Sequence, residues 1–192
     1  MNVATIILAA GRSSRMGGKF KPLLKLNNST FIEHIISEHL AAGVDNIIVV
    51  TGFHAEKLKP SLMQHDVTEI RNHHPECGMF SSIKTGLEQL PPVDAFFIHP
   101  VDTPLVDKTT LISIIKMFFE TLPELVQPVY KNRNGHPPLV NSSLVDSILS
   151  FDADGGLRAF FRTLRDVKKH NCTDIGILRG VNTQEEYKTL LS

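Results

Sequence analysis

The sequence predicts an α/β fold in which a parallel, doubly wound sheet carries helices on both faces. Short apolar segments rich in β-branched residues alternate with segments of helical periodicity, which is the pattern of repeated β-α-β units with right-handed crossovers. The 192 residues are 42% hydrophobic and 21% charged, which is typical of one globular domain with a substantial core. No linker, repeat or low-complexity segment interrupts the chain, so we expect a single domain over residues 1–192.

The first part of the chain contains two expected strands with a helix between them. Ala4–Leu8 and Asn46–Thr51 are short and apolar, as buried parallel strands are. Ser29–Ala42 is expected to be helical, and Gly43 is a residue suited to end a helix. The apolar residues that give this helix its spacing are Phe31, Ile32, Ile35, Ile36 and Leu40.

The next elements continue the alternation. A short helix over Ala55–Met63 is expected to lead to a strand near Val67–Arg71. A helix over Ser81–Leu90 then stops before two prolines, and Ala95–His99 is expected as a fourth, central strand. Lys108–Thr121 again has the spacing of an amphipathic helix.

The second half of the chain is less regular. Two strands are expected around a connection rich in Gly and Pro, followed by two helices, a strand and a terminal helix with Thr183 as its N-cap. In chain order these elements are Leu125–Tyr130, Pro138–Val140, Ser142–Leu149, Leu157–Leu164, Val167–Asn171 and the helix from about Gln184.

Composition argues against several classes of function. Twenty basic and twenty acidic side chains leave no formal net charge, so general binding to nucleic acid or to an anionic membrane is not expected. Two cysteines, Cys77 and Cys172, are too few for a disulfide framework or a zinc site. The N-terminus lacks a basic signal-peptide region, and no apolar run approaches the roughly 20 residues that span a bilayer. We therefore expect a cytoplasmic protein.

A glycine-rich, cationic loop follows the first strand, in the stretch LAAGRSSRMGGKFKPLL at residues 8–24. Ligands of an open parallel sheet bind beyond the carboxyl ends of its strands. Glycines there let backbone N–H groups approach a phosphate, and Lys and Arg supply charge. The spacing fits neither a Walker A loop, because five residues separate Gly11 from Gly17 and Phe20 follows Lys19, nor the G-x-G-x-x-G fingerprint. The loop thus indicates a phosphate site of another type; the alternative is a mobile surface loop.

The loop resembles the L-A-[AG]-G-x-x-x-R-M-G…K signature of the nucleotidylyltransferase superfamily, and it is most similar to the branch that transfers CMP or GMP to the molybdenum cofactor. This resemblance implies a Rossmann-like, three-layer αβα fold with a mostly parallel mixed sheet, of the nucleotide-diphospho-sugar transferase type. It also implies that the loop wraps a nucleoside triphosphate and that Lys21 and Arg15 are catalytic residues that hold its phosphates. The nucleotide-binding residues implied in the loop are Leu8, Ala9, Ala10, Gly11, Arg12, Ser13, Ser14, Met16, Gly17 and Gly18.

A second segment, from Gly78 to Ser82, is similar to the family's G-M-S-S-S stretch at a helix start beside the nucleotide. Ser81 and Ser82 would offer hydroxyls and helix N–H groups at the positive end of a helix dipole, although Ser82 could equally be an ordinary N-cap. Phe80 stands where the family usually has Ser, which removes one polar contact. Asn72, shortly before this segment, is expected to border the base.

The strand that ends at His99 leads into a segment similar to the family's D-x-P-[LF]-[VI] element, whose aspartate coordinates Mg²⁺. Asp102 is thus expected to be a catalytic Mg²⁺ ligand, since this cation is usually held by one or two protein oxygens together with phosphate oxygens. The alternative role for Asp102 is that of a turn residue. His99 is expected to be a packed or hydrogen-bonded core histidine.

The last similar segment surrounds Asn182 and resembles the family's [DN]-[IV]-[DN]-T-P-E-[DE] stretch. The matching residue lies beside the metal there, so Asn182 is expected to be a neutral metal ligand, or else a turn residue before the last helix. Two departures are Gly180, where a carboxylate or Asn is common, and Gln184 in place of Pro. Asp102 would then carry most of the protein's charge at the metal.

Two residues are candidates for binding the acceptor. His136 lies in a Gly-His-Pro-Pro stretch similar to the family's G-H-P-[VP]-[LF] segment, and it could donate to an anionic acceptor or simply hold the loop. Arg158 lies in a stretch that is loosely similar to G-D-x-G-[AL]-R, and it could bind an acceptor phosphate or be a solvated helical arginine.

The resemblance implies a Mg²⁺-dependent nucleotidyltransferase that moves CMP from CTP to molybdopterin or a related phosphorylated acceptor, with release of pyrophosphate. The Leu-Ala-Ala-Gly start resembles cytidylyl members, whereas guanylyl members tend to have Leu-Ala-Gly-Gly. One alternative is a sugar or alcohol phosphate as acceptor. Another is a nucleotide-binding accessory domain without turnover, which the changes at Phe80 and Gly180 leave open. No nucleic-acid or membrane partner is expected.

Overall fold

An eight-stranded mixed sheet forms the centre of the computed structural model, which describes residues 2–191. Its strand order is β10-β7-β9-β6-β1-β4-β5, with β8 paired to β7. β1, β4, β5 and β6 run parallel, while β9 runs antiparallel to its neighbours β6 and β7. The strands of this sheet are β1 Val3–Leu8, β4 Asn46–Thr51, β5 Thr68–Arg71, β6 Ala95–Pro100, β7 Leu125–Tyr130, β8 Arg133–Asn134, β9 Leu139–Asn141 and β10 Val167–Asn171. A separate hairpin consists of β2 Lys25–Leu26 and β3 Ser29–Thr30.

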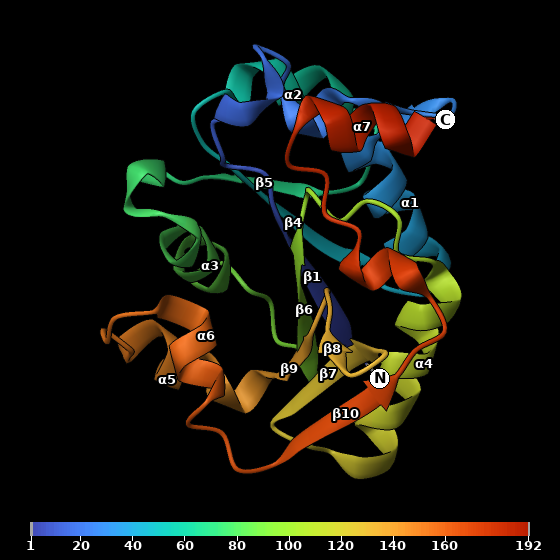
Figure 1. The fold of residues 1–192 in the computed structure, drawn as a ribbon. Helices are drawn as coiled ribbons and strands as arrows, with labels where there is room; N and C mark the ends of the chain where they lie inside the picture. The colour runs from blue at the N-terminus through green and yellow to red at the C-terminus, as the bar shows by residue number, and fades with distance from the viewer. Residues whose placement is uncertain (1, 192) are drawn as a thin grey trace.

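Helices cover both faces of the sheet (Figure 1). Ile6 and Phe96 are buried under α3, α5 and α6, whereas their neighbours in sequence, Ile7 and Phe97, are buried on the side of α1, α2 and α4. This alternation follows from the two-residue period of a strand. The helices are α1 Phe31–Ala41, α2 Ala55–Leu62, α3 Met79–Leu87, α4 Lys108–Thr121, α5 Val145–Ser150, α6 Gly156–Phe161 and α7 Gln184–Leu191.

The predicted α/β class and mostly parallel mixed sheet are confirmed, and α4, β7 and β10 have the predicted bounds. The antiparallel β9 departs from the purely parallel sheet that the residue pattern alone predicted. The cause is the β7–β8 hairpin, whose turn residues Lys131 and Asn132 both have positive φ (46° and 63°). Such a turn reverses the chain tightly, so β9 enters the sheet without a helical crossover.

The helix expected over residues 29–42 begins only at Phe31, because its first two residues belong to β3. The Thr30 hydroxyl accepts from the Glu33 N–H (3.4 Å), and the Glu33 carboxylate accepts from the Thr30 N–H (2.7 Å). This reciprocal capping box fixes the start of α1 directly after the hairpin. Within residues 2–191, no helix has the length and apolar character needed to cross a bilayer.

Candidate functional site

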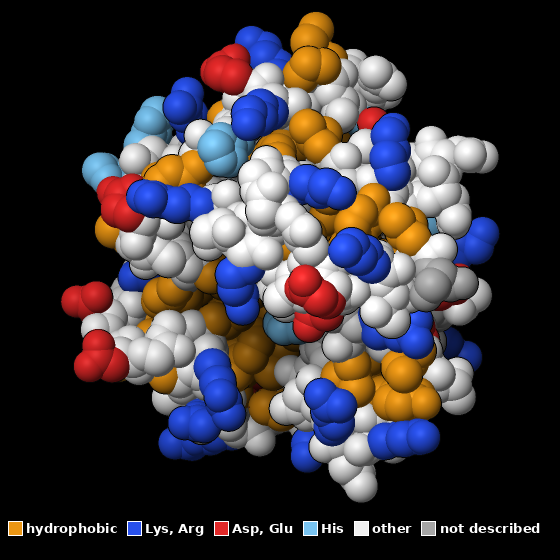
Figure 2. Space-filling model, turned by 45° about the horizontal axis from the view of Figure 1, so that its top comes forward, with side chains coloured by type: hydrophobic (Ala, Val, Ile, Leu, Met, Phe, Trp, Pro, Cys, Tyr) orange, Lys and Arg blue, Asp and Glu red, His pale blue; other side chains and the backbone are white. Residues whose placement is uncertain are grey.

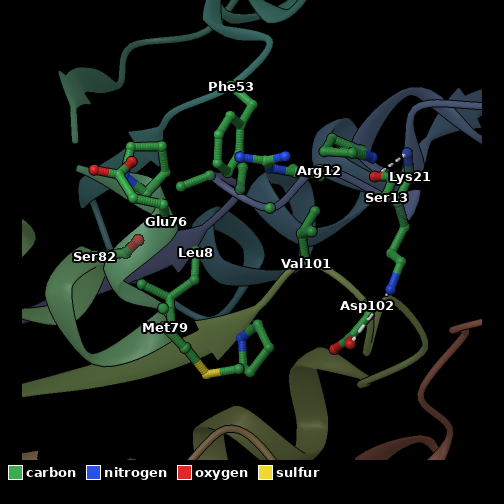
Figure 3. A pocket seen from close by; sticks show the side chains of 17 residues that line it. Leu8, Arg12, Ser13, Lys21, Phe53, Glu76, Met79, Ser82, Val101 and Asp102 are labelled. Carbon is green, nitrogen blue, oxygen red and sulfur yellow. Dashed lines mark hydrogen bonds and ion pairs between the residues drawn. The ribbon is translucent and has the colours of Figure 1, made fainter. Parts of the chain in front are cut away.

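A cleft of about 430 Å³ opens beyond the carboxyl ends of β1, β4 and β6 (Figure 3). It lies between the glycine loop, which we define as residues 9–21, and the start of α3. This is the place where an open α/β sheet binds ligands. Its lining residues are Leu8, Ala9, Ala10, Gly11, Arg12, Ser13, Lys21, Pro22, Phe53, Pro75, Glu76, Gly78, Met79, Ser82, Pro100, Val101 and Asp102.

The glycine loop is held in shape by an internal contact and by α7. The Lys21 N–H donates to the hydroxyl of Ser13 (3.0 Å), and Ser13 itself adopts a left-handed conformation (φ 56°). Gly17 (φ 58°) has no room for a Cβ, because the Gln184 side chain lies against it and donates to the Met16 carbonyl (3.0 Å). Gln184, which replaces the family's proline, therefore anchors the loop to α7.

Three side chains from distant parts of the chain meet at one end of the cleft, and we call them the Lys21 cluster: Lys21, Asp102 and Asn182. Lys21 Nζ lies 3.5 Å from Asp102 Oδ2, as Figure 3 shows, and it donates to Asn182 Oδ1 at 3.0 Å. The Asp102 carbonyl accepts from the Val181 N–H (2.7 Å), which ties the end of β6 to the segment before α7. Burial lowers the pKa of Lys21, and the Asp102 carboxylate opposes this shift.

The other end of the cleft is bounded by the segments after β4 and β5. The Arg12 guanidinium lies over the Phe53 ring, 4.0 Å from its centroid, a cation–π contact that joins the glycine loop to the end of β4. Glu76 and Ser82 add a carboxylate and a hydroxyl to the lining. Apolar and aromatic surface with a few polar groups is the usual lining of a small-molecule cleft.

Asn72 and Ser81 lie behind this lining. Asn72, which is 4% exposed, donates to the hydroxyls of Ser81 (2.9 Å) and Ser82 (3.0 Å) and accepts from the His74 N–H (2.8 Å). The Ser81 hydroxyl in turn donates to the Gly78 carbonyl (2.8 Å). These hydrogen bonds hold the start of α3 against the segment that follows β5.

The residues that the sequence predicted to bind nucleotide therefore fall into two groups. Those that line the cleft are Leu8, Ala9, Ala10, Gly11, Arg12, Ser13, Lys21, Gly78 and Ser82. Those outside its lining are Ser14, Arg15, Met16, Gly17, Gly18, Asn72 and Ser81. Met16 is fully buried in the same core cluster as Phe31, so its side chain supports the loop from behind. Arg15 is exposed, and its charge contributes to the lowered pKa of Lys21.

The lining also contains residues that were not predicted as site residues: Pro22, Phe53, Pro75, Glu76, Met79, Pro100 and Val101. Phe53 follows the end of β4 by two residues, so the rule that ligands bind beyond the carboxyl ends of strands could have identified it. Glu76 lies in the connection from β5 to α3, where no residue pattern distinguishes it from other surface residues, whereas Met79 begins α3 within the segment that resembles the family's G-M-S-S-S stretch.

The acceptor candidates lie outside the cleft lining. His136 as a residue is partly open to solvent although its ring is largely surrounded by protein, and its backbone N–H donates to the Ile177 carbonyl (2.8 Å). Desolvation lowers the pKa of His136, and the negative charge of the Asp102 carboxylate partly opposes this shift. Arg158 is exposed on α6.

Phe80, the residue that replaces the family's serine, has a packing role. Its ring lies 6.3 Å from that of Phe151 (centroid to centroid), and a Cβ on Gly156 would come within 3.3 Å of the Phe80 Cβ. Phe80 therefore joins α3 to the start of α6. Figure 2 shows a hollow with hydrophobic side chains on its floor and with basic, acidic and histidine side chains around it.

A buried series of hydrogen bonds, which we call the histidine chain, runs behind the Lys21 cluster. The Thr5 hydroxyl is hydrogen-bonded to His39 Nδ1 (2.8 Å), and His39 Nε2 is hydrogen-bonded to His99 Nδ1 (2.8 Å). His99 Nε2 is in turn hydrogen-bonded to the Thr103 carbonyl (2.9 Å). Because a carbonyl can only accept, His99 donates to Thr103, His39 donates to His99, and Thr5 donates to His39. Burial lowers the pKa of both histidines, that of His99 to about 4. The predicted core role of His99 is confirmed.

The donor chemistry of the Lys21 cluster fits a hard divalent cation. The Asp102 carboxylate and the Asn182 amide oxygen already face one cation, the Lys21 ammonium, and such oxygens are the ligands that Mg²⁺ prefers. No three His, Cys, Asp or Glu side chains among residues 2–191 are grouped so that they could hold a metal. Water or the oxygen atoms of a bound ligand would complete the coordination of such a cation.

Curated proteins and family models place the chain among known sequences. The model of the MobA-like NTP transferase domain matches residues 5–169. The bifunctional protein GlmU of Francisella philomiragia is 35% identical over 119 residues, which make up 60% of this chain and 26% of GlmU. The chain thus spans about a quarter of the length of the curated relatives it matches.

Solved structures share the fold over nearly the whole chain. Rv0371c from Mycobacterium tuberculosis H37Rv has a TM-score of 0.83 at 21% identity, covering 100% of this chain and 98% of that one, and a second Rv0371c structure is a complex with manganese. A nucleotidyl transferase from Methanothermobacter, Mth528, has a TM-score of 0.84 at 24% identity, covering 98% and 95%. Since the family model covers most of the sequence, the chain belongs to the MobA-like NTP transferase family within the nucleotidyltransferase superfamily.

Proposed function

We propose that this protein is a Mg²⁺-dependent cytidylyltransferase that transfers CMP from CTP to molybdopterin or a related phosphorylated acceptor. The observation that carries the proposal is the meeting of Lys21, Asp102 and Asn182 at the end of a cleft between the glycine loop and α3. The end of this cleft at Lys21 and Asp102 suits a triphosphate, and its other end, beside the Phe53 ring, suits a base.

Transfer requires an acceptor phosphate oxygen to bond to the α-phosphorus of CTP while the bond from that phosphorus to pyrophosphate breaks. The attacking oxygen is already anionic, so no general base is needed. The barrier lies in repulsion between the two anions and in the charge that builds on pyrophosphate. Lys21, Arg15 and the N–H groups of the glycine loop would bind the β- and γ-phosphates and neutralise that charge.

Asp102 and Asn182 would hold the divalent cation. When bound, such a cation stabilises developing phosphate charge as a Lewis acid. Asn182 is neutral, so Asp102 supplies the negative charge of this pair. On the acceptor side, we assign His136 and Arg158 as candidate donors to the acceptor's anionic group.

Two features of the base end support cytosine. Ala10 lines the cleft with a methyl group where guanylyl members tend to have glycine, and this methyl would leave less room for a purine. The Glu76 carboxylate is a hydrogen-bond acceptor, which suits the 4-amino group of cytosine and not the corresponding carbonyl of uracil.

Titration calorimetry with CTP, GTP, ATP and UTP in the presence of Mg²⁺ tests the nucleotide, and CTP is expected to bind most tightly. Tighter binding of GTP would overturn the cytidine assignment. Pyrophosphate release from CTP with molybdopterin tests the acceptor. Release only with a sugar phosphate or an alcohol phosphate would change the acceptor, and release with none would leave a nucleotide-binding domain without turnover.

A further inference from the structure

Lys21 lies where the proposed function requires a divalent cation. Its ammonium nitrogen is 3.0 Å from Asn182 Oδ1 and 3.5 Å from Asp102 Oδ2, and these are the two oxygen-bearing side chains proposed as metal ligands. The Lys21 side chain is only 13% exposed, so its charge is largely enclosed with those oxygens. A metal ion on the same oxygens would therefore lie directly against a second positive charge.

We propose that the Lys21 ammonium and the divalent cation are alternative occupants of this position, and that a triphosphate in the cleft draws Lys21 away from Asp102 and so admits the cation. This inference rests on the proposed function, which supplies the metal role of Asp102 and Asn182. It sets an order of binding: the protein alone binds the cation weakly, and the protein with nucleotide binds it tightly.

Electrostatic repulsion prevents the Lys21 ammonium and the divalent cation from occupying this position at the same time. Like charges that share one carboxylate at about 4 Å repel each other strongly where protein partly replaces water. The partly buried ammonium also needs a counter-charge, and Asp102 provides it in this arrangement. Lys21 thus competes with the metal for as long as no other anion is within its reach.

The ammonium can move while the Lys21 backbone stays in place. The Lys21 N–H is held by the Ser13 hydroxyl at 3.0 Å, and the next residue, Pro22, is buried. Beyond the backbone, a flexible four-carbon stem carries a compact charge that accepts anions from many directions. Lys21 and Ser13 both line the cleft, so phosphates bound there would give the ammonium a new partner without any rearrangement of the loop.

The backbones of the two proposed ligands are held independently of Lys21. The Asp102 carbonyl accepts from the Val181 N–H at 2.7 Å, and the Asn182 N–H donates to the Glu186 carboxylate at 2.6 Å. The same carboxylate caps the start of α7. Removal of the Lys21 side chain therefore leaves the backbones that carry the two oxygen-bearing side chains in position for a cation.

Binding of Mn²⁺ to the protein without nucleotide, measured from the EPR signal of unbound Mn²⁺, tests this exchange. Lys21→Met removes the ammonium and keeps an apolar stem of similar length, and we expect this variant to bind Mn²⁺ at least tenfold more tightly than the wild type. Lys19→Met is the matched control. It removes one charge from the same loop, but the Lys19 amine lies 5.6 Å from the centroid of the Tyr187 ring, and we expect less than a twofold change.

Asp102→Asn added to Lys21→Met should abolish the gain, which ties it to this position. Lys21→Gln, which keeps a polar end, should show the same gain and covers the case in which the methionine variant fails to fold. Mn²⁺ affinity in both Lys21 variants no higher than in Lys19→Met, or a gain that survives Asp102→Asn, would overturn the exchange.

The effect of nucleotide gives a second measurement. With the non-hydrolysable α,β-methylene analogue of CTP, the wild type should gain at least tenfold in Mn²⁺ affinity, and Lys21→Met should gain less, because its competitor is already absent. The equal gain of both proteins would contradict the exchange. The failure of pyrophosphate release with every acceptor would remove the proposed function and leave the Mn²⁺ comparison of the Lys21 variants intact, so the two ideas fail separately.

Discussion

The Lys21 cluster and the histidine chain contact the same segment, residues 99–103, and they differ in charge, burial and hydrogen bonding. The cluster is charged and partly exposed, 13% at Lys21 and 27% at Asp102, and its contacts measure 3.0 and 3.5 Å. The histidine chain is neutral, and its two rings, His39 and His99, are 0% and 1% exposed. Its hydrogen bonds measure 2.8 to 2.9 Å.

The difference separates residues that hold the segment from residues that can act on a ligand. Both ring nitrogens of each histidine are used inside the protein, and the Thr103 carbonyl fixes the direction of the whole chain, so an added proton or ligand finds no free partner there. The contacts of the Lys21 cluster are longer and open to the cleft, so they can be exchanged for contacts to phosphate. Residue type alone would not separate the two groups, since both contain residues common in active sites.

The largest expected effect on turnover comes from substitutions in the Lys21 cluster. Asp102→Ala or Lys21→Ala should lower turnover at least a hundredfold, because preorganised charges contribute roughly 3–4 kcal/mol to a transition state. The free energy of unfolding should change by no more than about 1 kcal/mol, the usual worth of a partly exposed ion pair. Pyrophosphate release and urea unfolding measure the two quantities, and a parallel loss of folding in both variants would assign them structural roles.

The next largest effect comes from the histidine chain, where a substitution should lower stability and leave turnover nearly unchanged. His39→Leu should lower the free energy of unfolding by about 1–3 kcal/mol, because Thr5 and His99 each lose a buried partner. Turnover of the folded protein should stay within about threefold, since no member of the chain lines the cleft. His73→Leu, at an exposed histidine, is the control and should leave both quantities unchanged. A large fall in turnover at unchanged stability would place the chain in the functional site.

The pH dependence of the free energy of unfolding tests the structural role of the histidine chain. Burial depresses the pKa of His39, and it depresses the pKa of His99 from 6.5 to about 4. Below about pH 6.5 these histidines bind protons in the unfolded state but remain neutral in the folded state. The free energy of unfolding is therefore at its full value above pH 6.5 and falls as the pH drops towards 4. Each histidine contributes a slope of about 1.4 kcal/mol per pH unit. Urea unfolding at pH 7, 6 and 5 should show this slope in the wild type and a flatter one in a His39→Leu, His99→Leu variant.

The smallest expected effect lies at the junction of α7 with the Lys21 cluster. Thr183 caps α7, because its hydroxyl accepts from the Glu186 N–H (3.2 Å), and Thr183→Ala should lower the free energy of unfolding by about 1 kcal/mol. Turnover should fall by a few fold at most, since Asn182 keeps its contact with Lys21. Lys188→Ala on the same helix is the control for stability. Unchanged stability in Thr183→Ala would show that α7 is held by its packing alone.

Local patterns predicted most of the elements and part of the candidate site. Apolar periodicity located α4, β7 and β10 with their observed bounds, because side chains two or four residues apart decide which face of an element is buried. The family resemblance of the glycine loop and of Asp102 put both at one cleft, where the structure also has them. The hairpin of β2 and β3 was missed, since its strands of two residues each are too short for any period to show.

The sequence by itself determined the α/β class, the glycine loop and the polar end of β6, because each is encoded by neighbours along the chain. Only the tertiary structure decided that Asn182 contacts Lys21 across 161 positions, that Gln184 closes on Gly17, and that His39 and His99 form one chain. Those contacts depend on the order of the strands and on the placement of α7. Chain segments far apart in sequence meet according to how the whole core packs, and no local spacing specifies that.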